Sequence, residues 1–396
     1  MIAIAIVVHG CYLGKTNFTG FTMSSMGLSS PDAAPQTYRA GTACIERVHT
    51  CASSESTRGE SPLEVVRRIA DSLEGDEEGV KIAWVIRSRY EDSESTNTLT
   101  TAWPMWFRAQ RGGYEKPLLY LLRSSTLNEL QSLATEAGER GILCNDAETQ
   151  SSGRSGGTLP AVPLWLASHA ACMPYDPASG EEARAIVLAA LRALYVDGAS
   201  GFYYLAAHNS VETSMSTLSE RCAEDAVKGM YLSETATSTV GGPSVRLLGG
   251  GKALGVVKAA ARLLREDWGV ESETWSCPSY TRLAREGHAA ERWNLLHPES
   301  ARRTSHLRQC LGSGRGPTIA ATCYPQTIAE QIGAFVPGRF TAIGGDWMTT
   351  DGASGRMKSG VLDERWMTAV ALKALADDGQ ISSHLVGQAV HSYGLA

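Results

Sequence analysis

The sequence predicts an α/β protein built from two doubly wound, mostly parallel sheets. Short apolar runs rich in β-branched and aromatic residues recur along the 396 residues, and segments with apolar residues at helical spacing lie between them. A hydrophobic content of 43% with only 20% charged residues is enough to bury two or three ordinary cores. Alternating strands and helices are typical of parallel sheets with helices on both faces.

Six segments are expected to form strands. The first, Ile2–Val8, is followed by the loop-forming Gly10, and it lacks both the basic start and the apolar length of a signal peptide. No run reaches the roughly 18 apolar residues that span a bilayer, so we expect no membrane partner. The other five expected strands are Val80–Ile86, Leu118–Leu122, Phe202–Ala206, Val245–Leu248 and Phe340–Ile343.

Between these strands, three segments carry apolar residues at helical spacing: Glu181–Tyr195, Gly255–Asp267 and Arg365–Asp377. Two segments without a clear period, Ser24–Gly59 and Gln150–Thr158, are expected to be loops or weak structure. The alternating pattern restarts after a polar stretch. We therefore expect a first domain over residues 1–210, a linker over 211–240 and a second domain over 241–396.

The charge and the cysteines exclude several classes of protein. The 36 Lys and Arg residues against 42 Asp and Glu residues give a net charge of −6, so no basic field is present to bind a nucleic acid. The nine cysteines are an odd number and widely scattered, without a C-x-x-C pair. This pattern indicates reduced thiols in a cytoplasmic protein, without a zinc site or a disulfide framework.

Six motifs occur in order over more than 200 residues from about Pro160 onward. They begin with Met173-Pro-Tyr-Asp-Pro177, Gly201-Phe-Tyr-Tyr-Leu205 and Lys228-Gly-Met-Tyr231, and continue with Val245-Arg-Leu-Leu-Gly-Gly-Gly251, Glu286-Gly-His-Ala-Ala-Glu-Arg-Trp-Asn-Leu-Leu-His-Pro298 and Gly344-Gly-Asp-Trp347. In this order and spacing the chain resembles the homodimeric, thiamine-diphosphate-dependent first component of pyruvate dehydrogenase, a member of the transketolase-like superfamily. Upstream, Lys116–Leu121 resembles the strand that precedes the cofactor loop in that family.

The resemblance covers two of the family's three domains, the pyrimidine-binding domain and the C-terminal domain. It therefore implies a pyrimidine-binding fold for residues 1–210 and a transketolase C-terminal fold for residues 241–396. The family's diphosphate-binding domain, with the Gly-Asp-Gly segment and later Asn that hold Mg²⁺ through oxygen ligands, has no counterpart here. The resemblance thus implies that thiamine diphosphate is shared with a companion subunit that supplies the Mg²⁺ ligands, with two of each chain in the assembly.

In the family, a carboxyl group of the pyrimidine-binding domain donates a hydrogen bond to the aminopyrimidine ring of the cofactor. Burial keeps such a carboxyl protonated by raising its pKa. Counting back from Pro117, Glu91 is the positional match, and Glu94 is the alternative. The acidic cluster around them is also typical of a solvated turn. Glu64, which precedes the helical run Val65–Leu73, is a third candidate, and its position also fits an acid at a helix start.

Two features of the family's site are replaced in this sequence. An aromatic residue that stacks on the pyrimidine ring falls near Ser125 or Leu127, neither of which can stack. A His-rich loop is replaced by Ser151–Thr158, which has no group that titrates near neutral pH. These departures suit either a changed substrate or a site that is partly lost.

Three histidines have positions that suggest a role. His9 and His208 follow expected strands, where open α/β sheets place ligand-binding groups, so contact with substrate is one interpretation and a backbone-bonded loop histidine is the other. His169 follows an apolar run and is expected to be a core histidine. In the segment Glu286–Pro298, Glu291 and Arg292 beside Trp293 indicate an interface or structural role.

The resulting hypothesis is one half of a split thiamine-diphosphate enzyme. Together with its companion it would decarboxylate a 2-oxo acid or cleave a ketose, and pass the fragment to a lipoyl or acyl carrier protein, as in specialised metabolism. The alternative is a noncatalytic subunit that keeps the fold for assembly or regulation. An oxidoreductase or hydrolase on the same fold is disfavoured, because Gly249–Lys252 matches no phosphate-loop motif and no nucleophile motif is present.

Overall fold

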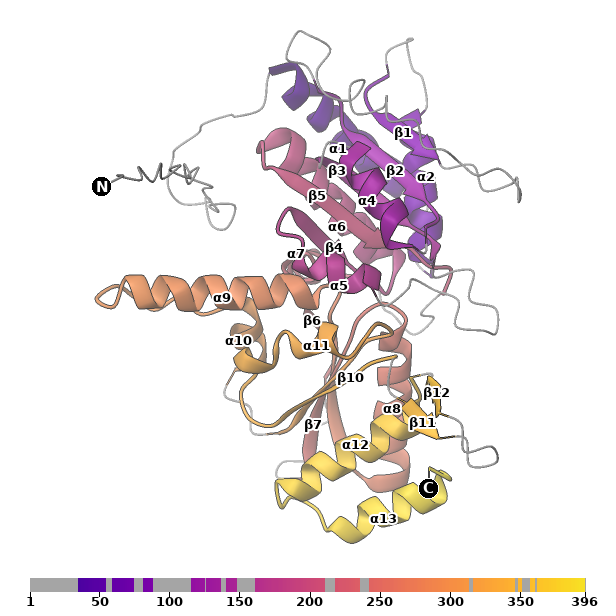
Figure 1. Ribbon diagram of the computed structural model, residues 1–396, viewed down its shortest axis with the longest axis vertical. Helices are drawn as coiled ribbons and strands as arrows, with labels where there is room; N and C mark the ends of the chain where they lie inside the picture. Colours follow the sequence, from indigo (N-terminus) through magenta and orange to yellow (C-terminus); the bar gives the residue numbers. More distant parts are fainter. Residues whose placement is uncertain are drawn as a thin grey trace, which may run out of the picture.

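The computed structural model shows two α/β domains stacked along the long axis of the molecule (Figure 1). The structure describes residues 35–54, 59–74, 81–87, 115–124, 126–136, 140–147, 161–210, 218–235, 242–312, 316–345, 348–350, 357–359 and 362–395. The predicted fold class is confirmed, because each domain is built on an open, mainly parallel sheet with helices on both faces.

The first domain contains a five-stranded sheet in the order β1-β2-β3-β5-β4, with every neighbouring pair parallel. Its strands are β1 (Trp84–Arg87), β2 (Leu118–Leu122), β3 (Arg140–Asn145), β4 (Cys172–Tyr175) and β5 (Gly201–Ala206). The strands expected at 118–122 and 202–206 are therefore confirmed, and β1 lies at the end of the run expected at 80–86. The expected strand Ile2–Val8 lies outside the described residues.

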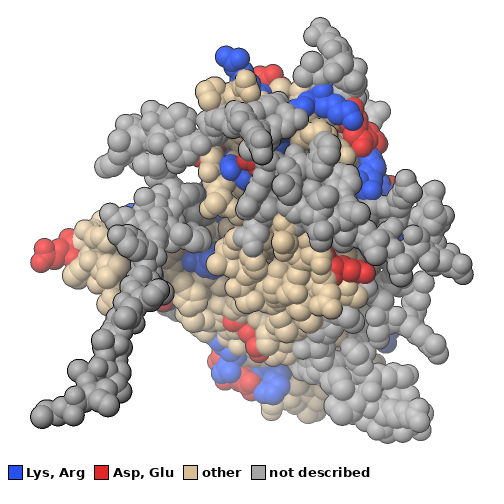
Figure 2. Space-filling view, turned by 45° about the horizontal axis from the view of Figure 1, so that its top comes forward, with Lys and Arg blue, Asp and Glu red and all other residues tan. Residues whose placement is uncertain are grey.

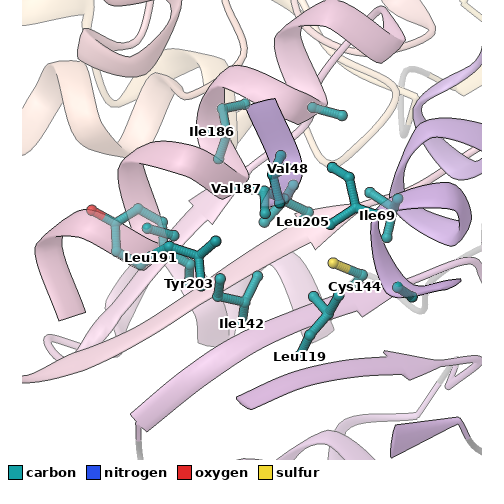
Figure 3. Close-up of a cluster of buried hydrophobic side chains, with 14 of the residues drawn as sticks. Val48, Ile69, Leu119, Ile142, Cys144, Ile186, Val187, Leu191, Tyr203 and Leu205 are labelled. Atoms are coloured by element: carbon teal, nitrogen blue, oxygen red, sulfur yellow. The ribbon is translucent and has the colours of Figure 1, made fainter. Parts of the chain in front are cut away.

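Alternate residues of the central strands pack on opposite faces of this sheet, as the two-residue period of a strand requires. Leu119, Ile142 and Leu205 pack under α1 (Pro35–Ser54), α2 (Pro62–Glu74) and α6 (Gly180–Leu191), as Figure 3 shows. Their neighbours along the strands pack under α4 (Leu127–Glu136) and α5 (Ala161–Ser168) on the other face. Because both faces are covered, the interiors of the central strands are apolar.

Helix α1 corrects the expectation of loop or weak structure over Ser24–Gly59. Its buried face consists of Ala40, Cys44 and Val48, which are spaced by four residues and at most 6% exposed. Gly41 lies against Tyr195, where an added Cβ would be 3.0 Å from the Tyr195 Cβ. Such a narrow stripe of small residues gives almost no apolar period in the sequence. The helix is therefore held by tertiary packing.

The second sheet has the order β10-β9-β7-β8-β6, in which only β6 is antiparallel to its neighbour. Its strands are β6 (Tyr231–Glu234), β7 (Ser244–Gly249), β8 (Glu271–Ser276), β9 (Thr318–Ala321) and β10 (Phe340–Ile343), which confirm the strands expected at 245–248 and 340–343. A separate antiparallel pair is formed by β11 (Met348–Thr350) and β12 (Met357–Ser359).

Helices also cover both faces of the second sheet. One face packs under α8 (Ala253–Trp268), α12 (Glu364–Asp377) and α13 (Ser383–Ser392). The other packs under α9 (Tyr280–Leu296), α10 (His306–Leu311), α11 (Thr327–Glu330) and the short helix η3 (Gly333–Phe335). The helices expected at 255–267 and 365–377 are confirmed as α8 and α12. The helix expected at 181–195 is α6 followed by a π-helical turn, η2 (Arg192–Val196).

The segment expected as a linker, residues 211–240, contains regular structure where it is described. Helix α7 (Glu220–Lys228) packs on α6 of the first domain, and β6 pairs with β8 of the second sheet. The chain therefore passes from one domain to the other between α7 and β6. The exact domain limits remain a prediction.

Helix α9 projects sideways from the molecule near the level where the domains meet (Figure 1). Its first half is anchored, because the Arg285 guanidinium donates to the carbonyl oxygens of Cys172, Ala167 and His169 in the first domain. At its outer end the Trp293 ring lies 3.6 Å from the His297 ring and 3.4 Å from the Arg303 guanidinium carbon. These contacts agree with a structural role for the segment Glu286–Pro298.

On the face drawn in Figure 2, basic and acidic side chains of described residues lie beside one another, around a broad area without charge. None of the described helices is long and apolar enough to cross a bilayer. No disulfide joins the described cysteines.

Candidate functional site

The carboxyl ends of the first sheet bring together the segments that follow β2, β3 and β5. Because these strands are parallel neighbours, Arg123-Ser124, Asp146-Ala147 and Ala207-His208 lie at one edge, which we call the first-sheet edge. Open α/β sheets bind ligands outside the carboxyl ends of their strands. Of the site residues predicted from sequence, His208 and Leu127 belong to this edge in the described structure.

His208 is 1% exposed, and its Nε2 lies 3.0 Å from the carbonyl oxygen of Pro177. Burial and the nearby Lys252 charge lower the pKa of this imidazole from 6.5 to about 4, although the backbone groups of Pro177 and Ser210 oppose the shift. At neutral pH the ring is therefore uncharged and its Nε2–H donates to Pro177. The His208 carbonyl also accepts from the Leu63 amide at 3.2 Å, which ties the start of α2 to this edge.

Asn145, the last residue of β3, organises the centre of the first-sheet edge. Its amide nitrogen donates to the Ser124 carbonyl at 2.7 Å and to the Tyr204 hydroxyl at 2.9 Å. Its amide oxygen accepts from the backbone N–H groups of Ser124 and Ala147. All four hydrogen-bonding positions of this carboxamide are used within the protein. Asn145 therefore fixes the strand ends and has no capacity left for a ligand.

Asp146 is buried beside Asn145 and is paired with two arginines. Both of its oxygens accept from Arg123 at 2.8 Å, and Arg67 of α2 approaches one of them at 3.5 Å. The Asp146 side chain is 2% exposed, whereas those of Arg123 and Arg67 are 26% and 44% exposed. Bidentate Arg–carboxylate pairs of this kind fix the geometry of both side chains. Through Arg67, the ion pairs of Asp146 join α2 to the first-sheet edge, and they give this edge a polar surface.

Sequence reasoning did not single out Arg123, Asn145 or Asp146. Their position could have indicated a role, because each of these residues ends or directly follows an apolar run that forms a strand.

The structure describes only one of the other predicted site residues. Leu127 is half-buried at the start of α4 and packs in the apolar cluster that contains Tyr204 and Leu166. The residues Glu91, Glu94, His9 and Ser125 lie outside the described residues.

Glu64, the third carboxyl candidate, belongs to the start of α2. Its carboxylate accepts from the Ser61 amide at 2.8 Å and the Ser61 hydroxyl at 2.9 Å, while the Ser61 hydroxyl accepts from the Glu64 amide. This is a capping box, and the hydrogen bonds from Ser61 lower the pKa of Glu64. A carboxyl stabilised in its ionised form cannot be the protonated donor that an aminopyrimidine needs.

A fully buried carboxyl that the sequence did not reveal lies where the two domains meet. Glu182 of α6 is 0% exposed and accepts from the Ala178 amide at 2.6 Å, from the Tyr231 hydroxyl at 2.7 Å and from the Ser276 hydroxyl at 2.6 Å. Burial raises its pKa, while these donors and the Lys258 charge act in the opposite direction. Tyr231 and Ser276 belong to the second sheet, so Glu182 joins the two domains.

The described part of the first-sheet edge does not by itself fit thiamine diphosphate. Glu64 and Asp146 are committed to the contacts above, and Leu127 offers no ring on which a pyrimidine could stack. No group of three His, Cys, Asp or Glu side chains among the described residues is arranged to hold a metal ion. The carboxyls predicted to hold the pyrimidine ring, Glu91 or alternatively Glu94, lie outside the described residues.

Comparison with known proteins identifies the second domain and the wider fold. Residues 229–361 match the family described as the transketolase-like TK C-terminal domain. The pyruvate dehydrogenase E1 component of Cupriavidus necator is 41% identical over 225 residues, which cover 57% of this chain and 25% of that protein. The corresponding proteins of Pseudomonas aeruginosa and Escherichia coli K12 are 36% and 31% identical over 57% of this chain. The predicted resemblance is thus confirmed.

The chain spans about a quarter of the length of these curated relatives. Among solved structures, the transketolase of Campylobacter jejuni is 11% identical and superposes with a TM-score of 0.52, over 89% of this chain and 51% of that one. At this identity the similarity shows the fold alone. It covers both α/β domains, because no single domain makes up 89% of the chain.

Proposed function

We propose that this chain is part of a thiamine-diphosphate-dependent enzyme that acts on a 2-oxo acid. The proposal rests in part on the match of residues 229–361 to the transketolase-like C-terminal domain. The identity of 41% with a pyruvate dehydrogenase E1 component is the observation that carries the proposal. In the proposed assembly a companion subunit binds the diphosphate and its Mg²⁺, this chain contributes the pyrimidine pocket, and two of each chain associate.

When bound, the cofactor would supply the electron sink that allows the bond next to the substrate carbonyl to break. In our proposal the carboxyl of Glu91, or of Glu94, holds the aminopyrimidine ring, and Ser125 and Leu127 lie near it. His9 and His208 are the proposed contacts to substrate. Since the pKa of His208 is about 4, it would act at neutral pH as an uncharged hydrogen-bonding group rather than as an acid.

The proposed substrate is a 2-oxo acid, with a ketose as the alternative, and the proposed acceptor is a lipoyl group or an acyl carrier protein. We propose that the protein works in the cytoplasm, in specialised metabolism. A specific observation favours a second candidate, a noncatalytic subunit. The polar groups of Asn145 and Asp146 at the first-sheet edge are committed to contacts within the protein.

Co-expression with a candidate companion chain, one that carries a Gly-Asp-Gly segment and a later Asn, tests the proposal. Calorimetric titration of the purified complex with thiamine diphosphate and Mg²⁺ should give saturable binding that neither chain shows alone. Glu91→Gln, or Glu94→Gln if that carboxyl holds the ring, should abolish decarboxylation of 2-oxo acids while the complex still assembles, and Glu224→Gln on the exposed surface of α7 is the control. A complex that assembles without binding the cofactor would favour the noncatalytic subunit. Failure of the two chains to associate would contradict both.

A further inference from the structure

The carboxyl ends of the two parallel sheets face each other where the domains meet. The loop after β4 is bonded directly to the loops after β7 and β8. The Asp176 amide donates to the Pro278 carbonyl at 2.7 Å, the Gly251 amide donates to the Asp176 carbonyl at 2.9 Å, and the Ser279 hydroxyl donates to the Pro174 carbonyl at 2.6 Å. Two edges that are each typical of ligand binding are therefore combined in one place.

A pocket, which we call the junction pocket, lies at this meeting point. Its empty volume is about 500 Å³ including open solvent at its mouth, and the centre of a water-sized sphere can occupy about 50 Å³ of it. Gly250 follows β7 and Thr322 follows β9, and both line it. These strands are neighbours at the centre of the second sheet, where the chain order of the strands reverses. Open α/β sheets bind their ligands at such a switch point, and domain interfaces are also favoured places.

Apolar groups from both domains form the walls of the junction pocket. Val162 and Leu166 of α5 line it from the first domain, and Ile328 of α11 lines it from the second. Its polar side chains already have partners. For example, the Tyr280 hydroxyl donates to the Ala321 carbonyl at 3.0 Å, and the Thr281 hydroxyl accepts from Gln331. The pocket therefore makes little demand for hydrogen bonds from a ligand.

The helix N-termini at the junction pocket are already occupied by groups of the protein. Helices α8 and α9 both begin there, and helix N-termini ordinarily favour a negative group. The protein supplies such groups itself. The Asp176 carboxylate lies so close to Gly251 that an added Cβ would be 2.1 Å from its oxygen, and the Ser279 hydroxyl caps α9 by accepting from the Arg282 amide. None of the described residues that line the pocket is a Lys, Arg or His that could pair with a carboxylate or phosphate.

We propose that the junction pocket binds an uncharged molecule with a small apolar ring or a short alkyl chain. The apolar end of the ligand enters the junction pocket between α5 and α11, and the ligand contacts both domains at once. Such a ligand stabilises the arrangement in which the two domains are packed together, because it binds only when both walls are in place. This inference is independent of the proposed function, since no residue assigned to the cofactor lines the pocket.

Fluorine NMR titration of the whole chain tests the proposal with two probes of similar size, namely fluorobenzene and fluorobenzoate. Fluorobenzene should bind saturably, and fluorobenzoate should bind roughly tenfold more weakly or not at all. Ile328→Phe, which fills the pocket, should weaken fluorobenzene binding by roughly tenfold or more. The matched control is Ile381→Phe, on the opposite face of the second sheet, which should leave binding unchanged.

Ile328→Ala provides a second variant in case the larger side chain disturbs folding, and it should bind fluorobenzene at least as tightly as the natural chain. The proposal is overturned if fluorobenzene does not bind, if fluorobenzoate binds more tightly than fluorobenzene, or if neither Ile328 variant changes the affinity. Because this titration requires neither thiamine diphosphate nor a companion chain, its failure is distinguishable from failure of the proposed function.

Discussion

Replacement of Glu182 should weaken the attachment between the two domains and lower the free energy of unfolding. The Glu182→Ala variant leaves three buried donors without their acceptor: the Ala178 amide, the Tyr231 hydroxyl and the Ser276 hydroxyl. Each unsatisfied buried donor costs about 1–3 kcal/mol, but hydroxyl groups can rotate toward other acceptors. We therefore expect a loss of about 3–5 kcal/mol in the free energy of unfolding.

The Glu182→Gln variant distinguishes the charge from the hydrogen bonds. Its carbonyl can still accept from the two hydroxyls that now bond Oε1, whereas its amide group faces the Ala178 N–H, another donor. We expect a loss of about 1–3 kcal/mol at acidic pH. Burial raises the folded pKa of Glu182 above its ordinary value of 4.5, so the folded state holds this proton more tightly than the unfolded state does. The natural chain should therefore lose stability as pH rises from 4.5 through the folded pKa, and the Gln variant should lack this component.

The assay is thermal unfolding followed by circular dichroism across this pH range. For 396 residues, at about 2.1 cal/mol/K of unfolding entropy per residue, a loss of 3–5 kcal/mol corresponds to a decrease in Tm of roughly 4–6 °C. Glu224→Gln on the exposed surface of α7 is the control and should change Tm by less than about 2 °C. The reasoning is refuted if Glu182→Ala behaves like the control, or if the Gln variant keeps the pH dependence of the natural chain.

Two further variants test local features at the same junction. Gly251→Ala should lower the free energy of unfolding by about 2–4 kcal/mol, because its Cβ would meet the Asp176 carboxylate at a backbone φ of +51°. Gly269→Ala, with φ of +62° and nothing within 4 Å, should cost only about 1 kcal/mol, and equal losses in urea unfolding would contradict the proposed close approach. His208 has a folded pKa of about 4, below its ordinary 6.5, so its contribution is present above pH 6.5 and is lost as pH falls toward 4. His208→Gln should remove up to about 3 kcal/mol of this pH dependence, and an unchanged stability profile between pH 4 and 6.5 would be the contrary result.

Five strands of the two sheets, β1, β2, β5, β7 and β10, could be predicted from the sequence because their apolar runs are a local property. Leu118–Leu122 and Phe340–Ile343 were expected at the bounds that the structure shows. Helix α1 could not be predicted, since its contact with η2 depends on Ala40, Cys44 and the close approach at Gly41. Small residues give a weak hydrophobic period, and only the neighbouring helix makes them a buried face.

The candidate site was less predictable than the fold. His208 was expected at the end of a strand, and the structure places it there, but its lowered pKa results from burial and from Lys252, which lies 44 positions further along the chain. Glu181 and Glu182 are adjacent and identical in type, and nothing local indicates that Glu182 would be the fully buried one. Which of two adjacent carboxyls on a helix becomes buried depends on which strands lie opposite that helix.

The sequence by itself determined that this protein is an α/β chain related to the C-terminal region of pyruvate dehydrogenase E1 components, because apolar periodicity and ordered motifs are carried by residues close together in the chain. Only the tertiary structure decided that the carboxyl ends of both sheets meet, that Glu182 joins the domains, and that Asp176 occupies the position beside α8 where an anion could bind. Those features arise from contacts between residues up to about a hundred positions apart, and such contacts have no signature in local sequence.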